Sequence, residues 1–215
     1  MQKKSSLAIA LAKISAFVFH PVFLPSLVFA YLIYFCPGLF FGIPDKSRNW
    51  WLVIIAYTTI TFPVLVVFLL WRLKFIESMH MQNEKERYGP LIASMLFYFW
   101  IFWLFHKQFA APELVQSFLL GVFLTSVGVF MATIFFKISM HAAGWGSVIA
   151  FAAIMFLMGV MNSLPLLVIS IFIGGLVGTT RLYLKAHIPA QIYSGYIVGA
   201  FMQIISFLII HNLFY

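Results

Sequence analysis

Long apolar runs separated by short polar segments occupy this chain from end to end. A hydrocarbon core about 30 Å thick needs roughly 20 apolar residues in each spanning helix. By this measure the pattern predicts an all-α, polytopic transmembrane bundle of seven helices. The third apolar run is short enough to be a re-entrant segment, which leaves six full spans as an alternative. The predicted helices are Leu7–Phe35, Trp51–Leu73, Leu91–Phe105, Leu114–Phe136, Ala142–Met161, Leu164–Leu184 and Ile188–Phe214.

Prolines and glycines refine these boundaries. Pro21 and Pro25 interrupt the first run and predict kinks there, because proline removes a backbone donor and clashes with the preceding turn. Pro90 and Pro189 stand where proline favours a helix start. The last two runs contain GGLVG and GYIVG, whose small residues four apart favour close packing of helices in lipid.

Composition excludes a water-soluble domain. Hydrophobic residues make up 64% of the 215 positions and charged residues 8%, with a mean hydropathy of +1.05. We therefore expect residues 1–215 to form a single integral membrane domain. The single cysteine, Cys36, excludes an internal disulfide and offers no thiolate cluster for a metal.

The net charge of +8 reports membrane orientation and does not indicate nucleic-acid binding. Seven helices with an inside amino terminus put only Lys46, Arg48 and Lys107 outside, among 13 Lys and Arg residues. This asymmetry predicts the sidedness, and the membrane we expect is the bacterial cytoplasmic (inner) membrane, with several passes of the chain. The residues on the cytoplasmic side would be Lys3, Lys4, Lys13, Arg72, Lys74, Lys85, Arg87, Lys137, Arg181 and Lys185.

Polar residues gather in three clusters, each at the end of an apolar run. The clusters are His80–Pro90, Lys137–Gly144 and Thr180–Gln191, and each places a cation beside a histidine or another polar group. The topology above puts all three on the cytoplasmic side. Because charge is costly near a bilayer, cationic clusters on one face predict an anion site. A phosphate on a membrane lipid is the anion we expect there.

The third cluster offers a nucleophile. His187 and Gln191 are i,i+4 neighbours, so the glutamine carbonyl can accept the imidazole Nδ1–H and hold Nε2 outward. Arg181 offers a planar fork of donors that suits phosphate oxygens. The alternative is that these residues are interfacial anchors that extend to lipid headgroups.

The second cluster stands at a predicted helix start, where unpaired backbone N–H groups favour anions. Ser139 can donate to a phosphate oxygen there, and His141 can protonate a leaving alkoxide as general acid. The alternative is that Ser139 only caps the helix while His141 lies in the membrane interface.

The order of these clusters resembles the phosphatidic acid phosphatase type 2 superfamily, lipid phosphatases related to vanadium haloperoxidases. Its third signature, Ser–Arg–five residues–His–three residues–Asp, is matched by Thr180, Arg181 and His187, with Gln191 at the aspartate position. The resemblance spans about Met79 to Gly199 and implies a phosphatase-like core in that range.

The other two signatures of the superfamily are matched in part. Ser139 and His141 match the Pro–Ser–Gly–His segment, whose proline and glycine are replaced here. Arg87 matches the arginine of the Lys–six residues–Arg–Pro segment, His80 takes the place of its lysine, and the proline is displaced. Lys85 is a candidate for the missing cation from another turn of the segment.

The resemblance implies a phosphatase that needs no metal and no other cofactor. The histidine that matches His187 attacks phosphorus, and water hydrolyses the resulting phosphohistidine. His141 protonates the leaving lipid oxygen, while Arg87, Arg181 and a nearby Lys hold the phosphate oxygens. The substrate would be a lipid phosphate or diphosphate in the bilayer.

Gln191 lacks the charge of an aspartate, and this departure leaves other functions open. The fold can persist without catalysis, as an inactive phosphatase-like protein that binds anionic lipid or serves as an accessory subunit of a larger membrane complex. A transporter is a further alternative, because His20 lies inside a membrane-length run that prolines interrupt.

Overall fold

Helices are the only regular elements in residues 6–77, 86 and 88–214, which are the residues described by the computed structural model. Within this part of the chain, seven helical segments are long and apolar enough to cross a membrane. This is the architecture of an integral, multi-pass membrane protein, as the sequence predicts. The segments are Ser6–Phe35, Asp45–Arg72, Tyr88–Lys107, Glu113–Phe135, Met140–Leu157, Ser163–Tyr183 and Pro189–Asn212.

The first span is broken rather than continuous. Helix α1 (Ser6–Val18) ends before His20, a short 3₁₀ turn covers Pro21–Phe23, and α2 (Leu24–Phe35) follows. The kink predicted at Pro21 is confirmed as this break, whereas Pro25 lies in the first turn of α2, where proline is tolerated. His20 therefore stands in the break and not within a helix, contrary to the sequence prediction.

The second span begins earlier than the sequence predicts. A 3₁₀ turn (Pro37–Phe40) leads to α3 (Asp45–Ala56), which starts six positions before Trp51. The polar residues at this start are stabilised locally, because Asp45 lies in the first turn and pairs with Arg48. A π-helical turn, Tyr57–Thr61, joins α3 to α4 (Phe62–Arg72).

The third span is full length. Helix α5 (Tyr88–Lys107) has 20 residues and is therefore about 30 Å long. Pro90 lies in its first turn, as predicted. A helix of this length can cross the hydrocarbon core, so the described structure favours seven spans over the six-span alternative.

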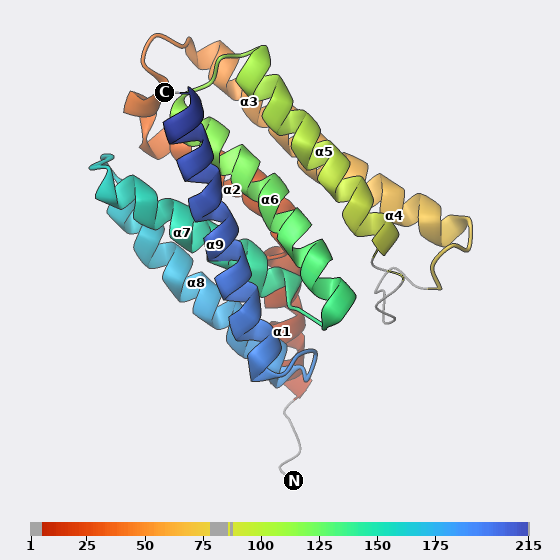
Figure 1. Ribbon diagram of the computed structural model, residues 1–215. Helices are drawn as coiled ribbons and strands as arrows, with labels where there is room; N and C mark the ends of the chain where they lie inside the picture. The colour runs from red at the N-terminus through yellow and green to blue at the C-terminus, as the bar shows by residue number, and fades with distance from the viewer. Residues whose placement is uncertain (1–5, 78–85, 87, 215) are drawn as a thin grey trace.

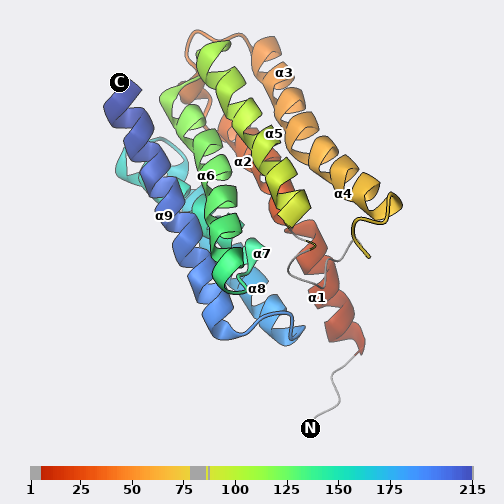
Figure 2. The same cartoon turned by 45° about the vertical axis from the view of Figure 1, so that its right-hand side comes forward.

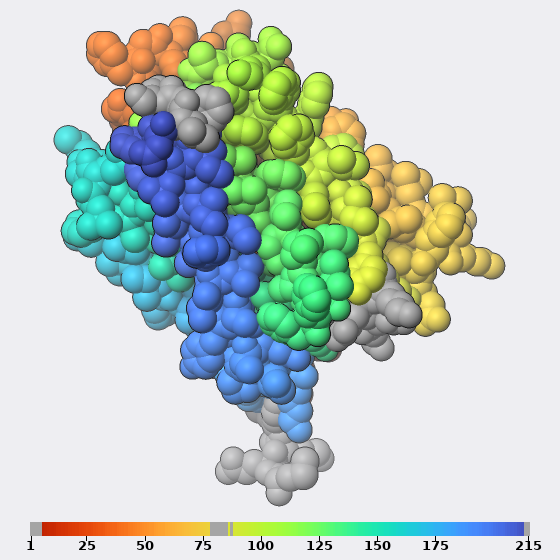
Figure 3. Space-filling view, viewed as in Figure 1, coloured from red at the N-terminus to blue at the C-terminus, as the bar shows by residue number. Residues whose placement is uncertain are grey.

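The most extensive contacts between helices in the described structure lie among the last four. These helices are α6 (Glu113–Phe135), α7 (Met140–Leu157), α8 (Ser163–Tyr183) and α9 (Pro189–Phe214). Figure 3 shows α9 crossing one face of the molecule between α6 on one side and α7 and α8 on the other.

Glycines allow this close packing. A Cβ atom on Gly199 would collide with the Ala143 carbonyl of α7, and one on Gly195 would lie 2.8 Å from the Ser139 carbonyl oxygen. A Cβ atom on Gly178 of α8 would lie 2.6 Å from the Tyr196 hydroxyl of α9. The packing role that the sequence assigns to GGLVG and GYIVG is confirmed.

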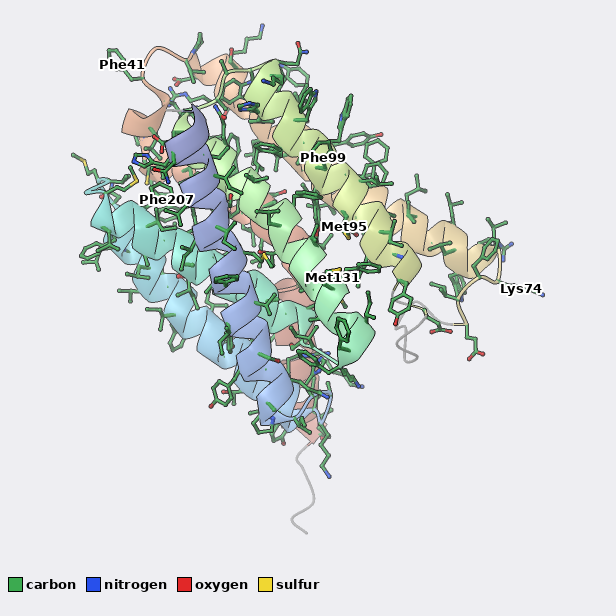
Figure 4. All side chains as sticks on the ribbon, in the orientation of Figure 1. Phe41, Lys74, Met95, Phe99, Met131 and Phe207 are labelled. Atoms are coloured by element: carbon green, nitrogen blue, oxygen red, sulfur yellow. The ribbon has the colours of Figure 1, made fainter. Side chains whose placement is uncertain are left out.

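The two ends of the described bundle carry different connections. Figures 1 and 2 show the α6–α7 link, the α8–α9 link and the start of α1 at one end, with the carboxyl-terminal end of α9 at the other. Figure 4 shows Phe41 and Lys74 at opposite ends of the second span. The second and third polar clusters therefore share the end that carries α1.

Candidate functional site

The third polar cluster lies where α8 joins α9. Arg181 is in the last turn of α8, His187 is in the link, and Gln191 is in the first turn of α9. Nδ1 of His187 lies 3.0 Å from Oε1 of Gln191, so the hydrogen bond predicted from the i,i+4 spacing is present. The backbone N–H of Ile188 also donates to Oε1, at 3.3 Å.

These two contacts determine which ring nitrogen of His187 carries the hydrogen. A backbone N–H can only donate, which identifies the shared atom of Gln191 as the amide oxygen. An amide oxygen only accepts, so Nδ1 of His187 carries the hydrogen. The lone pair of a neutral His187 is therefore on Nε2, the atom that a nucleophile requires.

The second polar cluster begins α7. Ser139 is fully buried (0% exposed), and its Oγ accepts a hydrogen bond of 3.3 Å from the backbone N–H of Ala142. Ser139 is thus the N-cap of α7, in an extended backbone conformation. Because Oγ is the acceptor in this contact, the hydroxyl hydrogen of Ser139 is not used in it. The donation of this hydrogen to a phosphate oxygen stays a prediction.

A backbone hydrogen bond joins the second and third clusters. The N–H of Ser139 donates to the carbonyl oxygen of Gln191, at 3.1 Å. Gly195, one turn further along α9, packs against the Ser139 carbonyl. Segments 52 positions apart in the sequence are therefore held together at the same end of the bundle.

His141 contacts the first span. Its Nε2 lies 3.0 Å from the carbonyl oxygen of Ala16, so Nε2 carries the hydrogen and Nδ1 is left for other partners. The ring of His20 meets the His141 ring edge to face, with centroids 4.9 Å apart and planes at 86°. His141 is 7% exposed, and the start of the break after α1 is among the elements that cover it.

His20 also belongs to this site, although the sequence marks it only as a histidine inside a membrane-length run. Its Nδ1 accepts from the backbone N–H of Val22 at 3.3 Å, which caps the 3₁₀ turn that begins at Pro21. A histidine directly before a proline, in the middle of a membrane-length run, was the available signal. Since Nδ1 accepts, Nε2 of a neutral His20 is the nitrogen that carries hydrogen.

Arg181 brings a fixed positive charge to these imidazoles. Its guanidinium lies close enough to interact electrostatically with both His20 and His141, and His187 interacts in the same way with His141. The structure therefore groups Arg181, His187, Gln191, Ser139 and His141, and it adds His20.

The first polar cluster contributes little to this description. Lys85, Arg87 and His80, the residues assigned to the first signature, lie outside the described residues. Glu86 is described, and its carboxylate accepts from the backbone N–H of Glu77 at 2.9 Å.

Carboxylates are scarce around the grouped residues. The sequence contains five Asp and Glu residues, and none follows Glu113, so α7, α8 and α9 carry none. Among the described residues, no three His, Cys, Asp or Glu side chains are grouped as a metal site. The arrangement thus offers fixed positive charge and imidazole nitrogens, which suit an anion better than a cation.

Comparisons of this chain with models of protein families, with curated proteins and with solved structures found no match. The resemblance to the phosphatidic acid phosphatase type 2 superfamily therefore depends on the residues of the three signatures and stays a prediction.

Proposed function

We propose that this protein hydrolyses a phosphate ester or diphosphate of a membrane lipid, with His187 as nucleophile and without a metal. The observation that supports this proposal is the grouping of Arg181, His141 and the His187–Gln191 pair at one end of the bundle. Phosphoryl transfer needs an oriented nucleophile and fixed positive charge around the phosphate oxygens, and these residues can supply both.

The reaction would proceed by two displacements at phosphorus. Nε2 of His187 attacks phosphorus while the bond to the lipid oxygen breaks, and Arg181 stabilises the charge on the equatorial oxygens. Lys85 and Arg87 are assigned the same role from the sequence. Water then attacks the phosphohistidine while neutral His141 accepts the proton of this water at Nδ1. This step releases inorganic phosphate, restores neutral His187 and returns His141 to its protonated form.

His141 would protonate the departing lipid oxygen. Because its Nε2–H donates to the Ala16 carbonyl, the transferred proton must come from Nδ1. His141 would then act as an imidazolium, formed once the negative charge of the bound phosphate offsets the nearby charge of Arg181, and it would become neutral when the lipid alcohol leaves. This assignment keeps the hydrogen bond to α1 intact throughout the reaction.

The substrates and the location of the protein follow from the resemblance and the charge distribution. Phosphatidic acid, phosphatidylglycerol phosphate and polyprenyl diphosphates are the candidate lipids. The excess of Lys and Arg at one end of the bundle supports a site on the cytoplasmic face of a bacterial inner membrane.

Phosphate release from these lipids by the purified full chain tests the proposal. We expect release in the presence of EDTA, inhibition by vanadate as a phosphate mimic, and loss of release in His187→Ala. His211→Ala is the matched control, because His211 lies on α9 at the opposite end and pairs with Glu113. Equal activity of His187→Ala and the unchanged protein would refute the nucleophile assignment.

A second candidate function is lipid binding without catalysis, either alone or as an accessory subunit. The full burial of Ser139 and the uncharged Gln191 favour it. It predicts no phosphate release from any of these lipids, together with binding of lipid phosphate that Arg181→Ala weakens. Measurable turnover that depends on His187 would exclude it.

A further inference from the structure

A cavity of about 300 Å³ lies between α2, α4, α5, α6 and α7. Its walls are mostly apolar, and they include side chains deep in the bundle, such as Phe118 (0% exposed) and Val148 (3% exposed). Val64 of α4 also lines the cavity and is 48% exposed on the lipid-facing surface of a spanning helix. The cavity is partly open, and its wall at Val64 belongs to a segment long and apolar enough to cross a membrane, so lipid would surround this part of the bundle.

One residue belongs both to this cavity and to the cationic site. His20 lines the cavity and makes the edge-to-face contact with His141. Thr125 gives the wall a polar atom, since its side chain is 7% exposed and its hydroxyl has no hydrogen-bond partner among the described residues. The cavity is thus apolar along most of its wall and meets the imidazoles and Arg181 at His20.

We propose that this cavity holds one hydrocarbon chain of the lipid phosphate, with the head group directed past His20 toward Arg181. The head-group part of this inference rests on the proposed function. The volume is at the lower end for small-molecule sites, which suits a single chain. Because lipid would surround the open part of the cavity, the molecule available to enter it is a lipid with its hydrocarbon chain.

The energetics of this site depend on where the chain comes from. A chain that moves from the bilayer into the cavity exchanges one apolar environment for another and gains little hydrophobic energy. Within a membrane the cavity would therefore position the lipid, while the cations bind its head group. A soluble short-chain phosphate comes from water, so each buried methylene should raise kcat/KM about fourfold, or about 0.8 kcal/mol.

Photo-crosslinking tests the chain site without requiring turnover. The probe is a phosphatidic acid with a diazirine near the end of one acyl chain, incubated with the full-length protein carrying His187→Ala in lipid nanodiscs. We expect label on buried wall residues that annular lipid does not reach, such as Phe118, Thr125 and Val148. Label confined to the outer surfaces of the helices would overturn the proposal.

Two tryptophan variants provide a matched comparison. Val64→Trp narrows the opening of the cavity, whereas Val168→Trp lies on the lipid-facing surface of α8, where Val168 is 57% exposed. Both sites are at the surface, so both variants should fold. We expect Val64→Trp to reduce label on the buried wall at least fivefold and Val168→Trp to leave it unchanged. Equal labelling in the two variants would contradict the chain site.

Chain-length kinetics separate this inference from the proposed function. In a series of soluble alkyl phosphates, Val64→Trp should remove the increase of kcat/KM with chain length. Its kcat/KM on the shortest alkyl phosphate should stay within twofold of the value for the unchanged protein. Hydrolysis with an unchanged chain-length dependence would overturn the chain site and leave the phosphatase proposal standing. Label on the cavity wall, together with no hydrolysis by the unchanged protein, would overturn the phosphatase proposal and leave the chain site standing.

Discussion

At the scale of single residues, the pair formed by His187 and Gln191 sets the orientation of the proposed nucleophile. Its spacing fixes both side chains on one face, and the structure contains the expected hydrogen bond at 3.0 Å. His20 could not be found in this way, because its contact with His141 joins residues 121 positions apart. Local spacing predicts local contacts, whereas contacts between spans depend on how the helices pack.

Substitution of Gln191 tests the orientation of the proposed nucleophile. Gln191→Ala removes the acceptor for Nδ1–H of His187, and we expect kcat for lipid phosphate hydrolysis to fall about 10²-fold, because a small misplacement of a reacting group costs this much. Gln191→Glu keeps an oxygen at the same position and should retain most of the activity near neutral pH. Equal losses in the two variants would argue that Gln191 serves packing only.

At the scale of helices, the sequence predicts which segments span the membrane but not where the backbones touch. All seven apolar runs form helices, because length and hydropathy decide membrane insertion, and five of them have both ends within three residues of the predicted bounds. The exceptions are the second run, which starts at Asp45 and not at Trp51, and the fifth, which ends at Leu157 and not at Met161. The early start of α3 was missed because its first residues are polar and carry no apolar signal. The break at His20 was predicted only as a kink, since a proline marks the region but not the residue that caps the next turn.

The contact of α7 with α9 makes a quantitative prediction about stability. Gly199→Ala forces a methyl group against the Ala143 carbonyl of α7, and overpacking of this kind costs about 1–3 kcal/mol. We expect a lower midpoint of thermal unfolding in detergent, measured by circular dichroism or dye fluorescence.

Gly175→Ala is the control for this variant. Gly175 lies within α8, and a Cβ atom there would meet nothing within 4 Å in the described structure. Alanine is the better helix former by about 1 kcal/mol, so this variant should be as stable as the unchanged protein or more so. Equal destabilisation by both substitutions would show that the α7–α9 contact has no special role.

At the scale of the whole molecule, the fold brings the second and third clusters to one end, and the charge pattern predicts on which side of the membrane that end lies. The three Lys and Arg residues predicted outside, Lys46, Arg48 and Lys107, lie near the start of α3 and the end of α5. An odd number of spans places the amino and carboxyl ends on opposite sides. Sidedness is therefore a property of the chain as a whole, and one label at each end can test it.

Cysteine labelling tests this topology in intact cells. Cys36 is buried and is first replaced by alanine, so that each variant carries one introduced cysteine as its single site for the maleimide. Lys46→Cys and Lys185→Cys place exposed thiols at opposite ends of the bundle. A membrane-impermeant maleimide added outside should label Lys46→Cys and leave Lys185→Cys unlabelled until the membrane is permeabilised. The opposite pattern would mean that the bundle has the reverse orientation in the membrane. The site would then lie on the outer face, where the proposed phosphatase would act on lipids of the outer leaflet.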